Sequence, residues 1–358
     1  MDQKIAHQEI LHRCFRCGYC KLPENFSDFA CPAYLAFGFE TSAPGGRMWL
    51  LRAWLEDQIP VSDRFAEIMF SCATCGNCTS NCAMPGFKDY ILMAFNAGKE
   101  AMLDAGRVPP GVRDYLTRMQ RHGNAYGKSA RQRAAWAETG GIPAYDGHEY
   151  LLFAGDVGSY DPRGQAIARS AAGLLSRSGV SFGVMAQGEC ADGNDVLALG
   201  ETALFAELAE KNIAAWDAKG VRKIITLSPH AFNVFKNEYP AMGGNFQVHH
   251  YTQVLAFAMG RLKFAGTPEP VTVTFHDPCY LGRHNWDCES PRMVLRAIPG
   301  LTLLEMDRSR KNALCCGGGG GNLFTDVLGG ADQSAARARV GEAAGVGAQV
   351  LAVACPLC

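Results

Sequence analysis

Residues 14–20 read CFRCGYC and residues 72–82 read CATCGNCTSNC, and these two stretches decide the expected fold of the first ninety residues. Each opens with three cysteines in the pattern C-x-x-C-x-x-C. A tight turn presents three thiolates at this spacing, and a [4Fe–4S] cubane needs a fourth thiolate from elsewhere. The sequence therefore predicts two iron–sulfur clusters near the N-terminus.

The fourth ligand of each cluster is expected from the other motif, because the chain of a two-cluster ferredoxin doubles back on itself. Ten residues separate Cys20 from Cys31, and this insertion reads as a loop. A zinc site is the alternative, but zinc favours four ligands in two C-x-x-C pairs, which eight cysteines in two triplets plus singles fit poorly. We assign one cubane to Cys14, Cys17, Cys20 and Cys82, and the other to Cys72, Cys75, Cys78 and Cys31.

Apolar residues between and after these motifs recur at helical spacing. Met48, Leu51 and Leu55 lie three or four residues apart, and residues 89–106, DYILMAFNAGKEAMLDAG, also read as a helix. We therefore expect residues 1–126 to form an α-helical ferredoxin domain with two [4Fe–4S] clusters. Residues 127–148 are polar and contain glycines, so we expect a linker there.

From residue 149 onward, short apolar runs alternate with helical stretches such as ALFAELAEKNIAAWDAKG at 203–220. This alternation predicts an α/β architecture, and hence an α+β multidomain chain overall. The expected strands are residues 150–155, 180–186, 221–227, 271–275, 301–306 and 350–354.

The two halves of this region resemble each other. FAGDVGSYDPRG at 153–164 resembles TFHDPCYLGRH at 274–284, and IITLSPHAF at 224–232 resembles LAVACPLC at 351–358. We infer a duplicated unit, residues 149–268 and residues 269–358. The second copy has Cys279, Cys315, Cys316, Cys355 and Cys358, where the first has Gly158, Cys190, Ala191, Ser228 and Ala231. Because one of five cysteines survives in the first copy, we expect that copy to serve mainly as scaffold.

The five cysteines of the second copy fall at strand ends and loops, where an open α/β sheet places its ligands. Five thiolates exceed one tetrahedral metal site, so the set favours an unusual cluster. A zinc or redox-disulfide role for Cys355 and Cys358 stays open, but it leaves the vicinal pair Cys315–Cys316 unexplained. The glycine run 317–321 allows a close backbone approach to a cluster, a substrate or a neighbouring strand.

FHDPCYLGRH, ALCCGGGGG and ACPLC resemble the cysteine-rich CCG domain of heterodisulfide reductase and its relatives. The two N-terminal motifs resemble the helical ferredoxin domain of the HdrD-like subunits of that family, so the resemblance covers nearly the whole chain. It implies a noncubane [4Fe–4S] cluster of the disulfide-cleaving kind, and no second one, because the first copy lacks the ligands. The chain ends on a predicted ligand, so we expect either a longer gene product or an incomplete last motif. The implied ligands are Cys279, Cys315, Cys316, Cys355 and Cys358.

The resemblance implies an iron–sulfur oxidoreductase subunit that passes electrons singly through two cubanes to the noncubane cluster, for disulfide-type two-electron reduction within a multi-subunit complex. The alternative is a non-catalytic relay linking a flavoprotein, an acyl-CoA enzyme or a 2-hydroxy-acid oxidising enzyme to another acceptor. No flavin or nicotinamide fingerprint occurs, so we expect electrons from a partner subunit, either a flavoprotein or an iron–sulfur protein. His276 and His284 flank Cys279 and are candidate catalytic proton donors. Their alternative role is to satisfy loop backbone groups, and His230 is a weaker candidate.

Composition excludes several classes of protein. The 358 residues, 48% apolar, suit two or three domains with real cores. A net charge of −1 disfavours nucleic acid and anionic membranes as partners, and no apolar run reaches membrane-spanning length. Fifteen cysteines without a secretory signal argue for thiolate ligands in a reducing cytosol rather than for disulfides. We expect a cytoplasmic protein, either free or peripheral to a membrane complex.

Overall fold

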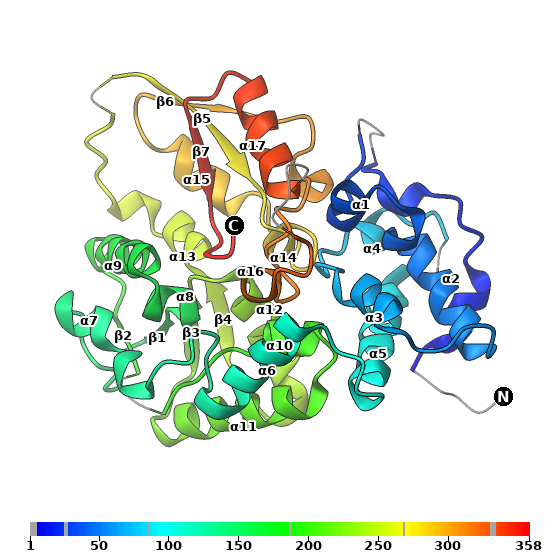
Figure 1. Cartoon of the computed structure of the whole chain (residues 1–358). Helices are drawn as coiled ribbons and strands as arrows, with labels where there is room; N and C mark the ends of the chain where they lie inside the picture. The colour runs from blue at the N-terminus through cyan, green and yellow to red at the C-terminus, as the bar shows by residue number, and fades with distance from the viewer. Residues whose placement is uncertain are drawn as a thin grey trace.

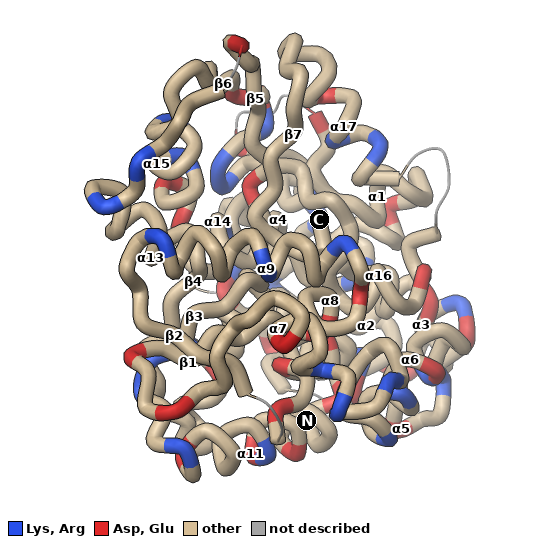
Figure 2. Tube along the Cα trace, turned by 90° about the vertical axis from the view of Figure 1, so that its left-hand side faces the viewer, with Lys and Arg blue, Asp and Glu red and all other residues tan. Residues whose placement is uncertain are grey.

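The computed structural model describes residues 6–24, 28–84, 86, 88–185, 188–267, 269–329 and 334–358. These residues form a helical N-terminal part followed by two parallel β-sheets with helices around them (Figure 1). Acidic and basic residues are interspersed along the trace, in keeping with the net charge of −1 (Figure 2). Among the described residues, no helix is long and apolar enough to cross a membrane.

The N-terminal part is helical throughout its described residues, as its apolar spacing predicts. Leu51, Met69 and Phe95 are fully buried at its centre. Helices α2 and α5 approach so closely that a β-carbon at Gly98 would lie 2.5 Å from Leu51 Cδ2. Its elements are η1 (Gln8–Arg13), η2 (Tyr19–Lys21), α1 (Pro32–Phe37), η3 (Glu40–Ser42), α2 (Pro44–Leu55), α3 (Asp63–Phe70), α4 (Asn77–Asn81), η4 (Lys88–Tyr90), α5 (Ile91–Asp104) and α6 (Pro110–His122).

Residues 127–148 differ from the expected plain linker. They contain the short helices η5 (Ala130–Gln132) and α7 (Ala135–Thr139), and the side chain of Trp136 is buried among the helices of the first sheet. Arg133 is also buried and pairs with Asp156 at 2.7 Å and Glu189 at 3.0 Å. A buried indole and a buried ion pair hold this segment in place, although its composition is polar and rich in glycine.

The first sheet has four parallel strands in the order β2-β1-β3-β4. Leu151 of β1 pairs with Ile224 of β3, and both side chains are fully buried. The expected strand 180–186 shrinks to two residues, and Ala186 lies outside the described residues. The elements are β1 (Tyr150–Phe153), α8 (Gly155–Tyr160), α9 (Pro162–Arg177), β2 (Phe182–Gly183), α10 (Asn194–Ala198), α11 (Thr202–Ala218), β3 (Lys223–Thr226), α12 (Pro229–Asn237), η6 (Tyr239–Met242), β4 (Gln247–His250), α13 (Tyr251–Phe257) and η7 (Met259–Arg261).

The second sheet has three parallel strands in the order β6-β5-β7, with the first strand of the unit at the centre. The first sheet has the same arrangement in β2-β1-β3. Figure 1 shows α14 and α16 of this part between its own sheet and the rest of the molecule. The elements are β5 (Val271–His276), α14 (Cys279–Gly282), α15 (Ser290–Arg296), β6 (Leu301–Leu304), η8 (Arg310–Asn312), α16 (Asn322–Thr325), α17 (Ala335–Gly345) and β7 (Val350–Val353).

Candidate iron–sulfur centres

The first group of cysteines lines one cavity in the helical part. The loop curls because Arg16 and Gly18 have φ angles of +56° and +87°, which turns the three cysteines of the first motif inward. Cys82, at the end of α4, reaches the same cavity from the second motif. Cys17 is the exposed member of the group. The cavity is lined by Cys14, Cys17, Cys20 and Cys82, the four residues that sequence spacing groups together.

A second cavity lies beside the first and is more deeply buried. Cys31 reaches it from the residue before α1, and Cys20 lines both cavities. Burial raises the pKa of Cys31 to about 11, although the nearby cation Arg47 opposes this shift. Bound iron would supply the positive charge that four thiolates, three of them buried, require, so this donor set fits a cubane. The cavity is lined by Cys31, Cys72, Cys75 and Cys78, again as the spacing groups them.

The third group brings together five cysteines of the second α/β part. Cys279 and Cys315 have their sulfurs 3.9 Å apart, and Cys316 and Cys358 have theirs 3.2 Å apart. Cys355 is buried and lies against Cys358. All fifteen cysteines fall within the described segments, and none forms a disulfide. Five free sulfurs converging without a disulfide fit a site that holds iron.

The glycine run places backbone directly against neighbouring loops. A β-carbon at Gly320 would lie 2.7 Å from the Cys72 carbonyl oxygen, and one at Gly318 would lie 2.5 Å from the Leu357 carbonyl oxygen. The backbone amides of Gly317 and Gly318 donate to the sulfurs of Cys315 and Cys316. The glycine run 317–321 therefore packs the third cysteine group against the loop that carries the second cysteine group.

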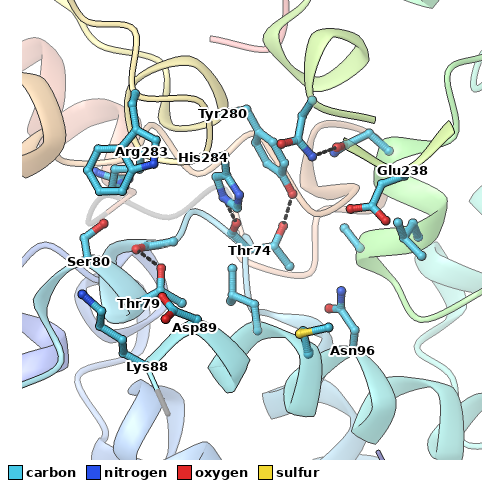
Figure 3. A pocket seen from close by; sticks show the side chains of 18 residues that line it. Thr74, Thr79, Ser80, Lys88, Asp89, Asn96, Glu238, Tyr280, Arg283 and His284 are labelled. Carbon is cyan, nitrogen blue, oxygen red and sulfur yellow. Dashed lines mark hydrogen bonds between the residues drawn. The ribbon is translucent and has the colours of Figure 1, made fainter. Parts of the chain in front are cut away.

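Side chains tie the second and third cysteine groups together. The thiols of Cys75 and Cys315 lie close enough to interact. The buried guanidinium of Arg283 donates from Nε to the Cys75 carbonyl oxygen at 2.7 Å, and from Nη1 to the carbonyl of Ala313. The hydroxyls of Tyr280 and Thr74 are 2.9 Å apart (Figure 3). The two candidate centres therefore share a wall.

The two candidate catalytic histidines occupy different places. His276 accepts from Arg339 Nε on its Nδ1 at 3.0 Å, so Nε2 carries the ring proton. A ring nitrogen of His276 and the sulfurs of Cys316 and Cys358 all lie within 4.8 Å of one another. His284 instead donates from Nε2 to the Thr74 carbonyl oxygen at 2.9 Å. Burial lowers the pKa of His284 to about 4, so the neutral ring serves a backbone group.

A cavity of about 390 Å³ opens beside this shared wall (Figure 3). The rings of Tyr280 and His284, stacked with centroids 4.1 Å apart, form one side of it. Lys88 and Asp89 lie on the opposite side. Sequence reasoning named His284 but missed Tyr280 and the contacts that both residues make with Thr74, because these contacts join positions some two hundred residues apart.

Known protein families account for both ends of the chain. Residues 10–85 match the 4Fe-4S dicluster domain, and residues 273–358 match the cysteine-rich domain called CCG. The chain is therefore an iron–sulfur protein that joins a dicluster ferredoxin domain to a CCG domain. This confirms the expected ferredoxin domain and one CCG domain, and the first α/β part has no separate family match here.

Two similar proteins indicate more closely which kind of iron–sulfur protein this chain resembles. The chain is 38% identical over 304 residues to the probable iron-sulfur-binding oxidoreductase FadF of Bacillus subtilis, covering 82% of this chain and 42% of FadF. It is 35% identical over 271 residues to EtfAB:quinone oxidoreductase of Syntrophomonas wolfei, covering 73% of this chain and 37% of that protein. It thus spans about two-fifths of these two relatives.

A third relative matches along nearly its whole length. The chain is 29% identical over 376 residues to a subunit of the dihydromethanophenazine:CoB--CoM heterodisulfide reductase of Methanosarcina barkeri, covering 97% of this chain and 87% of that relative. The chain belongs to the HdrD-like iron–sulfur proteins of the heterodisulfide reductase family.

Proposed function

We propose that this chain is an oxidoreductase subunit that carries electrons from a partner protein to the CCG site, where a disulfide-type substrate takes up two electrons. The observation that carries the proposal is the unbroken contact between the three cysteine groups. Cys20 lines the first and second cavities, and Cys75 contacts Cys315 of the third group. Such contiguity is what electron transfer between bound clusters requires.

The proposed ligands follow the three groups. Cys14, Cys17, Cys20 and Cys82 hold one cubane, Cys31, Cys72, Cys75 and Cys78 hold the other, and Cys279, Cys315, Cys316, Cys355 and Cys358 hold a noncubane cluster. When bound, the cubanes supply one-electron carriers and the noncubane cluster supplies the site of two-electron reduction. The proposed path has an exposed cysteine at each end, Cys17 in the first group and Cys358 in the third.

Two residues then have separate roles. His276 is the proposed catalytic histidine, because its ring lies beside the sulfurs of Cys316 and Cys358 and its buried Nε2–H has no hydrogen-bond partner among the described residues, so it can donate to a sulfur at this site. His284 holds the second and third groups together through the Thr74 carbonyl, and any proton it supplied to a substrate would first have to break that bond.

We also infer that the two α/β parts, residues 149–268 and 269–358, arose by duplication. The strand orders β2-β1-β3 and β6-β5-β7 support this inference. So does the placement of matching residues, since Gly158 and Cys279 follow the central strands on α8 and α14, and Ser228 and Cys355 follow β3 and β7.

The iron content of anaerobically purified protein tests the ligand assignment. Three four-iron clusters give about twelve iron atoms per chain. A value near eight would remove the noncubane cluster and leave an electron relay.

The relay is the second candidate function, and the likeness to a protein named EtfAB:quinone oxidoreductase favours it. Assaying the reduced protein against mixed thiol disulfides separates the two. Turnover supports the reductase, and no turnover with all clusters intact supports the relay.

A further inference from the structure

His230 belongs to the α/β part that has lost its cysteines. It occupies the third position of Ser228-Pro-His-Ala, the segment that matches Cys355-Pro-Leu-Cys in the other part. Its side chain is buried at the start of α12. Sequence reasoning ranks it only as a weaker candidate proton donor, but its side chain reaches the other α/β part.

The imidazole of His230 links a carboxylate to a cysteine of the third group. Nδ1 lies 3.1 Å from Asp195 Oδ1 and 3.0 Å from Asn194 Nδ2. The ring also lies close enough to the Cys355 side chain for the two groups to interact. Nδ1–H donates to the Asp195 carboxylate, and this buried negative charge favours a second ring proton on Nε2, the nitrogen left to face the sulfur.

Neighbouring groups fix the ring in this orientation. Tyr280, on the helix that carries Cys279, packs against it with ring centroids 4.2 Å apart. On another side, a β-carbon at Gly319 would lie 3.0 Å from His230 Cε1, so the glycine run leaves just enough room for the ring. Both neighbours belong to the elements that surround the third cysteine group.

We propose that His230, oriented by Asp195, is a positioning residue of the CCG site that donates a hydrogen bond to Cys355. This inference rests on the proposed function, because it concerns the cluster that Cys355 helps to hold. A hydrogen bond to a ligand sulfur draws charge from it and stabilises the reduced cluster, which raises the reduction potential. A residue of the first α/β part thus tunes the cluster site of the second α/β part.

The test is a redox titration of whole, cluster-loaded protein, followed by electron paramagnetic resonance. In His230→Leu, the midpoint potential of the third cluster should move to a more negative value, while both cubane signals keep theirs. Asp195→Asn should move it in the same direction by less, because the ring remains but loses its orienting partner. His249→Leu is the matched control, a histidine on β4 of the same α/β part whose ring packs on Tyr150.

An unchanged third midpoint in His230→Leu would overturn the proposal. If His230→Leu instead loses the third cluster, His230→Gln decides, because its amide can donate to Cys355. Retention of about twelve irons in His230→Gln supports the hydrogen bond, and loss in both variants assigns His230 a packing role only.

Failure of the proposed function has a different signature. Wild-type protein with about eight irons would lack the third cluster altogether. In that protein, the rate at which iodoacetamide alkylates Cys355 still reports the contact, since a donated hydrogen bond stabilises the reactive thiolate. A slower rate in His230→Leu would support the hydrogen bond, and an equal rate would overturn it.

Discussion

The two α/β parts share a strand order but bury their strands differently. Ile224 and Trp216 of the first part are fully buried, whereas Val350 and Val353 of β7 in the second part are 47% and 42% exposed. The first part therefore has an apolar core of its own, whereas the interior of the second part contains three of its five grouped cysteines, Cys279, Cys315 and Cys355. A domain with a small apolar core can gain much of its folding free energy from the metal that its side chains bind. The part that holds the five cysteines is thus also the part with the more exposed strand.

The largest effect is expected on cluster content, when a cysteine of the third group and a cysteine of the first α/β part are each replaced by serine. Cys315→Ser should remove the third cluster, about four of twelve irons, and leave both cubane signals, because Cys315 belongs to the third group alone. Cys190→Ser is the control at the corresponding position of the first part. Its thiol meets Leu208 O at 3.3 Å and Asn212 Oδ1 at 3.4 Å, contacts that a hydroxyl also makes. Iron analysis and electron paramagnetic resonance check both, and loss of cubanes in Cys315→Ser would contradict the separation of the groups.

Buried arginines give the next largest effect. Arg283→Met should lower the free energy of unfolding by about 2–5 kcal/mol, because the carbonyls of Cys75 and Ala313 lose a charged donor. Arg133→Met should cost a similar amount in the first part, where Asp156 loses its partner. Urea unfolding measures both.

The two arginine substitutions should also differ in their effect on the spectroscopic signals of the clusters. Only Arg283→Met should also alter the signals of the second cubane and the third cluster, because its charge lies beside Cys75, Cys279 and Cys315. Equal changes in Arg133→Met would contradict this assignment.

A glycine substitution should have a smaller effect. Gly320→Ala places a β-carbon 2.7 Å from the Cys72 carbonyl oxygen on a backbone with φ of +64°, and should destabilise the protein by about 1–3 kcal/mol. Gly341→Ala, in α17 with no atom within 4 Å of the new β-carbon, should be neutral or slightly stabilising. Thermal unfolding compares the two variants. Equal melting temperatures would show that the backbone of residues 317–321 can move to accommodate the added β-carbon.

The smallest effect concerns pH in the first part. Burial raises the pKa of Asp192 to about 6. Because the folded state holds this proton more tightly than the unfolded state, its stabilising contribution is present at low pH and is lost as pH rises through 6. Asp192→Asn stays neutral and should flatten the stability profile between pH 5 and 7 by roughly 1 kcal/mol. Urea midpoints across that range measure the slope, and parallel profiles would contradict the assignment.

Local spacing predicts the cysteine groups well. The fourth members, Cys82 and Cys31, lie in the cavities that the motif swap requires, because covalent spacing in a compact domain leaves few other arrangements. The alternation of apolar runs likewise predicts two parallel sheets. What sequence could not supply is contact between distant segments. Arg283 with Cys75 and His230 with Cys355 join residues whose side-chain types are individually ordinary, and the helix of residues 135–139 depends on burial of Trp136 rather than on composition.

The approach of Gly320 to the Cys72 carbonyl has a consequence for how the protein matures. One wall of the CCG site is the backbone of the second cubane's loop, more than two hundred residues earlier in the chain. That wall exists only once the helical domain has folded around its own cysteines. Insertion of iron should therefore proceed in order, with the N-terminal clusters in place before the last site is complete.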